Sequence, residues 1–156
     1  SQPSPPPAPS PTHQKTKASP LMTEAFRQAI EKAVDWPRKD VASAGKIKPM
    51  VFFAHGDGTM KAVSLSLKDE YHKESLIRKI REKAHAEHAF AVLLLTETNS
   101  ENHTAILSGV SPGMKASVYV DYSFDPESKI ITSRTINWLN RAFHDTLIDG
   151  IFDANV

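Results

Sequence analysis

The stretch AFAVLLLTET, residues 89–98, constrains the fold most, because its first seven residues are all apolar. A strand with one solvent-exposed face alternates apolar and polar residues, whereas a continuous apolar run is typical of a strand covered on both faces. A membrane-spanning helix needs about 20 apolar residues, so this run is too short to cross a bilayer. We therefore expect the central strand of a sheet, in a soluble protein that does not insert into a membrane.

Strand-like segments lie on both sides of this run. Residues 48–68 predict two strands joined by a two-residue turn at Asp57-Gly58, with both turn residues at positive φ. Three segments that follow the run are also strand-like, and the second alternates apolar with polar side chains: TAILSGV, ASVYVDYSFD and KIITSRTI. The sequence thus predicts five or six strands, most of them joined as hairpins.

Apolar residues at three- and four-residue spacing predict three helices. The first begins at Ser19-Pro20 and ends near Trp36, which precedes a proline. The second covers residues 68–88, and the third covers residues 137–149, NWLNRAFHDTLID. Since neighbouring hairpins leave few crossovers, the expected fold class is α+β: a mainly antiparallel five- to six-stranded sheet with helices packed on one face.

The N-terminal residues 1–20 hold seven of the eleven prolines and few apolar side chains. Such a segment buries too little surface to offset its ordering entropy, so we expect a disordered Pro-rich leader or linker before a single α+β domain, residues 21–156. Its proline spacing also suits the grooves of proline-binding domains, the functional alternative to a spacer. A start at Ser favours a mature exported protein, periplasmic or secreted, although a trimmed chain or a piece of a longer polypeptide would look the same.

Charge and composition exclude several classes of function. A net charge of +1 gives no field that would attract nucleic acid or an anionic membrane. The basic residues between 78 and 83 are interleaved with glutamates, which is typical of a solvent-exposed helix face. Cysteine is absent, which excludes disulfides, thiol nucleophiles and thiolate zinc sites. We expect no cofactor and no nucleic-acid partner.

Two short motifs suggest a serine hydrolase. Residues 52–58 run from a strand into a His-Gly-rich loop around His55, as in an oxyanion pocket, and GVSPG places Ser111 at the centre of a nucleophile-elbow motif. Asp121 or Asp125 and then His144 would complete a triad. An elbow, however, must lead from a strand into a helix, whereas the residues after Ser111 alternate as a strand. We therefore expect extended backbone there, and a hairpin rather than an oxyanion loop at His55.

Histidines and acids offer weaker candidates. His85 and His88 lie three apart near a helix end and could share a metal with Glu82 or His55. A zinc site needs at least three protein ligands, and no other spacing in the chain supplies the rest, so we expect no metal site. Possible acids for a cleft are Glu97 and Asp121, while Asp149 and Asp153 are expected only to cap or solvate the C-terminus.

The sequence favours a small soluble binding or regulatory module over an enzyme. Its expected partner is a protein, held in an apolar groove or at an exposed sheet edge, where a partner's strand can pair with the backbone. Self-association through the same edge is a further expectation. The alternative is a small hydrolase using Ser111 or a histidine-bound metal.

Overall fold

The structure, a computed structural model, describes residues 23–39, 47–65, 73–99, 101–142 and 147–153. The described helices are α2 (Glu24–Asp35), the 3₁₀ helix η1 (Trp36–Lys39) and α3 (Lys73–Ala86). The strands are β1 (Met50–Ala54), β2 (Met60–Ser64), β3 (Ala91–Asn99), β4 (Thr104–Ser111), β5 (Met114–Phe124) and β6 (Ile131–Trp138). The expected leader, residues 1–20, lies outside the described residues. No helix in the described ranges is long and apolar enough to span a bilayer.

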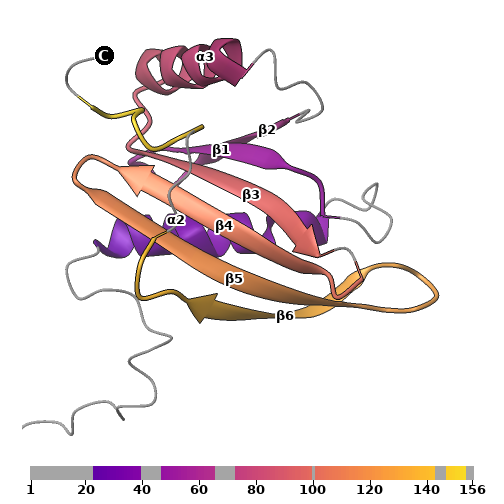
Figure 1. Cartoon of the computed structure of the whole chain (residues 1–156). Coiled ribbons are helices and arrows are strands. Elements are labelled where there is room, and N and C mark those ends of the chain that lie inside the picture. Colours follow the sequence, from indigo (N-terminus) through magenta and orange to yellow (C-terminus); the bar gives the residue numbers. More distant parts are fainter. Residues whose placement is uncertain (1–22, 40–46, 66–72, 100, 143–146, 154–156) are drawn as a thin grey trace, which may run out of the picture.

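The strands form one six-stranded sheet in the order β2-β1-β3-β4-β5-β6, and every neighbouring pair is antiparallel (Figure 1). This confirms the α+β class and the mainly antiparallel sheet. The apolar run forms β3, which lies inside the sheet between β1 and β4, as expected. Only the pairing of β1 with β3 joins strands separated by a helix. The edges of the sheet are β2 and β6.

Helix α2 begins at an N-cap, since the Thr23 hydroxyl oxygen accepts a hydrogen bond from the Phe26 N–H at 3.3 Å. Its buried side chains recur at helical spacing: Phe26, Ala29, Ile30, Ala33 and Val34. They pack on the sheet face that carries Phe52, Leu93, Leu95, Leu107, Val118 and Val120. In Figure 1 this helix lies behind the sheet. The larger of the two apolar cores is therefore sandwiched between α2 and the sheet.

The opposite face of β1 and β3 holds a second core. Alternation along the strands turns Val51, Phe53, Val92 and Leu94 to this side. Ile80 and Ala84 of α3 cover them, and the C-terminal side chains Leu147, Ile148 and Ile151 complete the cluster. The expectation that the helices share one face was therefore wrong: α2 and α3 cover opposite faces, because β1 and β3 are apolar on both sides.

The expected third helix, residues 137–149, is not formed by its described part. Trp138 ends β6, where it pairs with Val118, and the Leu139 N–H donates to the Ser117 carbonyl oxygen at 3.1 Å. The residues from 147 to 152 form turns instead. Trp138 pairs with β5 as a strand residue. Its helical spacing to Ala142 therefore does not lead to a helix. Residues 143–146 lie outside the described residues.

The β1–β2 turn also differs from its expected form. The His55 N–H donates to the Thr59 carbonyl at 2.9 Å, and the Gly58 N–H donates to the His55 carbonyl at 3.0 Å. The loop therefore has three residues, Gly56 to Gly58, and only Gly58 takes positive φ, at 90°. This geometry is a type I turn followed by a left-handed glycine. Asp57 instead accepts bonds from the Thr59 N–H and hydroxyl at 2.9 and 2.6 Å, which fixes the start of the second strand.

Candidate functional site

Ser111 ends β4 and is followed directly by a hairpin, because Pro112 and Gly113 form the turn and Met114 begins β5. Gly113 has φ of 77°, the value of the third residue of a type II turn, in which Pro is common at the second position. The chain after Ser111 passes through this two-residue turn into a strand and not into a helix, so the expected strand is confirmed. The Ser111 hydroxyl is buried and donates to the Phe90 carbonyl oxygen at 2.7 Å. The serine hydroxyl therefore has a structural role: its hydrogen bond connects the β4–β5 hairpin to Phe90, the residue before β3.

The other members of the hypothetical triad lie apart. Asp121 is exposed on β5, where it accepts a hydrogen bond from the Thr104 hydroxyl at 2.8 Å. Asp125 lies in the β5–β6 turn, and the Ser128 N–H donates to its carboxylate at 2.7 Å. Both acids thus make local contacts at the end of the sheet away from Ser111: Asp121 with a side chain of the neighbouring strand and Asp125 with the backbone of its own turn. His144 lies outside the described residues.

His55 follows β1 and meets a polar cluster at the end of α3. Its Nε2 is 3.4 Å from the Glu87 carboxylate, which also contacts Lys61 Nζ at 3.1 Å and Lys83 Nζ at 2.7 Å. The Lys83 hydrogen bond, followed by that of Lys61, holds the Glu87 pKa below its usual range, with burial acting in the opposite direction. The cluster joins the β1–β2 hairpin to α3 and contains one carboxylate among three basic groups.

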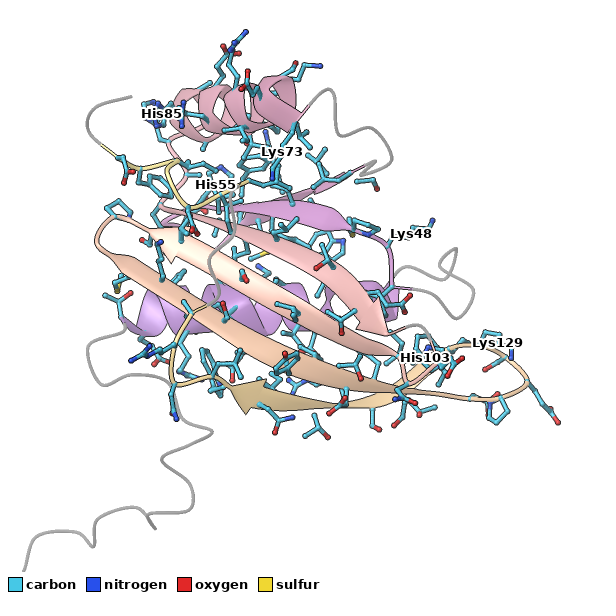
Figure 2. The ribbon with its side chains drawn as sticks, in the orientation of Figure 1. Lys48, His55, Lys73, His85, His103 and Lys129 are labelled. Carbon is cyan, nitrogen blue, oxygen red and sulfur yellow. The ribbon has the colours of Figure 1, made fainter. Side chains whose placement is uncertain are left out.

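The candidate metal ligands do not converge. His85 Nε2 lies 3.1 Å from the Ile151 carbonyl oxygen, while His88 is exposed just after α3, at φ of 55°. Figure 2 shows His103 at the other end of the sheet from His85. In the part of the chain that the structure describes, no group of three or more His, Asp or Glu side chains could hold a metal ion.

Small cavities flank the sheet on two sides, both lined by described residues. The first, about 190 Å³, lies between α2 and the β1–β2 turn, and Lys32 spans it by donating to the Gly58 carbonyl at 2.6 Å. The second, about 350 Å³, lies between the β4–β5 hairpin and the C-terminal segment, beside the Lys115–Asp149 ion pair at 3.3 Å. The remaining candidates are structural or solvent-facing: Glu97 lies 3.4 Å from the Ile47 N–H, and Asp153 is exposed. Neither cavity brings together the residues that a reaction would need.

The edge strand β6 presents the other candidate site. Hydrogen-bonded and non-hydrogen-bonded pairs alternate along an antiparallel ladder. The bond from Leu139 to Ser117 fixes that alternation, so Asn137, Thr135 and Ser133 direct their N–H and C=O groups towards β5. The intervening residues Arg134, Ile136 and Trp138 direct theirs away from the sheet. Among the described residues, nothing pairs with these outward groups.

The side chains of β6 do not protect this edge against pairing with a further strand. Natural edges are commonly protected by proline, lysine or short length. The eight-residue β6 has neither proline nor lysine, and its one charged residue, Arg134, makes two hydrogen bonds to Asp35 of α2 at 2.9 and 3.1 Å. Asp35 raises the Arg134 pKa above its usual value, so this side chain stays charged and bound beneath the sheet. Ile136 and Trp138 are half-buried against the α2 core.

The opposite edge is better protected. Strand β2 has five residues and carries Lys61, whose side chain is 63% exposed. Sequence reasoning anticipated an exposed edge without saying which strand forms it. The signal was the run ITSRTINW, which has neither lysine nor proline, but its importance depended on strand order.

Comparisons with protein-family models, with curated proteins and with solved structures found no match to this chain. The fold and the β6 edge therefore have to be interpreted from their own geometry.

Proposed function

We propose that this protein is a protein-interaction module that binds an extended segment of its partner along β6. The observation that carries the proposal is the outward row of backbone N–H and C=O groups at Arg134, Ile136 and Trp138. A strand added there makes main-chain hydrogen bonds, which are largely independent of the partner's sequence. Specificity comes from the side chains on the two faces of the added strand.

The two faces next to β6 differ in chemistry. On the α2 side, Ile136 and Trp138 are half-buried and extend the apolar core to the edge. On the other side, β6 presents Ser133, Thr135 and Asn137, which are polar. An added strand with alternating apolar and polar residues matches both faces at once. The favoured partner segment therefore alternates in this way and carries no proline at its pairing positions.

The proposal is tested by selecting binders from a random-peptide display library on the intact protein. Ile136→Pro removes an outward N–H without removing a bond to β5, which edge strands tolerate. We expect selected peptides to bind the wild type and the matched control Ile136→Val, and to lose binding to Ile136→Pro. Amide hydrogen exchange should show new protection at Arg134, Ile136 and Trp138 in the complex. Peptides that bind all three proteins equally and protect no β6 amide would contradict the proposal.

The structure favours no second function. A small hydrolase using Ser111 would need that hydroxyl free for attack, whereas it donates to the Phe90 carbonyl. A screen of ester and phosphate substrates on wild type and Ser111→Ala checks this: activity that disappears in the variant would revive the hydrolase.

A further inference from the structure

We infer that the segment bound at β6 is β6 of a second copy of the chain, paired antiparallel about a two-fold axis through Ile136. This inference rests on the proposed function and names its partner. This pairing joins the six-stranded sheets of two protomers into one continuous sheet of twelve strands. Both protomers then cover their exposed edge with the same surface, as a two-fold dimer requires.

The positions of the outward groups select the axis. The regular part of β6 begins at Ser133, because the register shifts between Ser123 and Phe124 of the partner strand. Its outward residues, Arg134, Ile136 and Trp138, are therefore symmetric about Ile136. In an antiparallel pair centred there, Ile136 lies opposite its own copy and Arg134 lies opposite Trp138. All three outward residues of each protomer then exchange both backbone bonds, which is the complete set.

Moving the axis by one residue, to Thr135 or to Asn137, would pair one of the three outward residues outside the regular part of the strand. Charge disfavours a larger shift. Moving the axis to Arg134 places two guanidinium groups directly opposite each other, and like charges at such positions are destabilising. Moving it to Trp138 leaves the outward groups of Arg134 without a partner in the regular part of the strand. With the axis at Ile136, Arg134 lies opposite Trp138 and not opposite a second cation. The polar face of the same dimer pairs Thr135 with Asn137.

Disulfide trapping tests this arrangement directly, because the chain has no cysteine of its own. In the dimer, the two Ile136 Cα atoms lie about 5.5 Å apart, within the range of a disulfide. The two Thr135 Cα atoms lie about 8 Å apart, which is beyond that range. Under mild oxidation we expect a covalent dimer of Ile136→Cys and none of the adjacent control Thr135→Cys.

A second pair of variants covers the case in which Ile136→Cys fails to fold. Thr135 and Asn137 face each other across the axis as a non-hydrogen-bonded pair, with Cα atoms about 4.5 Å apart. Both residues lie on the face away from α2, so neither substitution disturbs the α2 core. Oxidation of a mixture of Thr135→Cys and Asn137→Cys should give the mixed dimer, while each variant alone should stay monomeric on a denaturing gel.

Noncovalent association provides an independent readout. Sedimentation of the wild type should show a dimer fraction that rises with concentration, retained in Ile136→Val and lost in Ile136→Pro. A monomer at every concentration with no crosslink overturns the inference. If display-selected peptides still bind through β6 in that case, edge binding survives and only the partner is wrong; if they do not, both proposals fail. Crosslinking of Thr135→Cys alone would also overturn the inference, since it requires a different axis.

Discussion

The Tyr122 hydroxyl donates a hydrogen bond of 2.6 Å to the Val34 carbonyl oxygen, which ties β5 to the last turn of α2. The last carbonyls of a helix have no partner within the helix, so this bond satisfies one of them in the core. Burial raises the Tyr122 pKa well above its usual value, and the charge of Asp35 acts in the same direction. The hydroxyl therefore remains a donor across the pH range in which the protein is folded.

Tyr122→Phe removes this donor and leaves a buried carbonyl unpaired. We expect the free energy of unfolding to fall by about 1–3 kcal/mol, the cost of an unsatisfied buried polar group. Urea denaturation measures the change, and the slope with denaturant should stay constant, because the surface exposed on unfolding is unchanged. An unaltered midpoint would mean that the bond contributes nothing net.

The β1–β2 turn allows a matched test of backbone strain. Gly58 takes φ of 90°, whereas Gly56 in the same loop does not have positive φ, and a Cβ at either position would meet nothing within 4 Å. We expect Gly58→Ala to destabilise the protein by roughly 1–2 kcal/mol, the cost of the left-handed region for an L-residue, and Gly56→Ala to have a much smaller effect. Thermal unfolding of both variants measures the difference. Equal effects would contradict the assignment of strain to Gly58.

Gly109 lies where β4 passes close to Phe26 of α2. A Cβ there would be 3.2 Å from two ring carbons of Phe26 and 3.3 Å from Leu93 Cδ2. We expect Gly109→Ala to destabilise the protein by about 1–3 kcal/mol through overpacking. In a Phe26→Leu background, whose smaller side chain leaves room, the same substitution should cost less. A double-mutant cycle by urea denaturation measures this coupling, and a cycle with no coupling would refute the steric explanation.

Glu87 makes stability depend on pH. Its pKa is lower in the folded protein than its usual value, chiefly because of the Lys83 hydrogen bond. A carboxylate of this kind stabilises the folded state above its unfolded pKa, and the contribution is lost as pH falls through the folded pKa. We expect Glu87→Gln to be less stable than the wild type near neutral pH and to converge with it in acid. Urea midpoints measured from about pH 7 down to about pH 3 decide this, and parallel curves would count against it.

Local sequence determined most of the strands and two of the helices, because each depends on periodicity within a short window. The apolar run at residues 89–98 predicted an internal strand, and β3 lies inside the sheet. The alternation after Ser111 predicted a strand and thereby extended backbone, which the structure has. The predicted turn at Asp57-Gly58 was in the right place but one residue too short. The hydrogen bond between His55 and Thr59 decides the length of the loop, and the identities of Asp57 and Gly58 alone do not reveal that bond.

Tertiary structure decided what periodicity could not. Trp138 and Leu139 have helical spacing to later apolar residues, but β5 offers them strand pairing, and that partner lies outside any local window. The C-terminal Ile148 and Ile151 fill the second sheet face because β1 and β3 are apolar on both sides. The sequence by itself determined the chain's capacity to form a sheet of hairpins with buried interior strands. The strand β6 is an edge because β1 pairs with β3 and no further strand of the sheet pairs with β6. Such a strand order depends on contacts between residues far apart in the chain, and it leaves the outward backbone groups on which the proposed function rests.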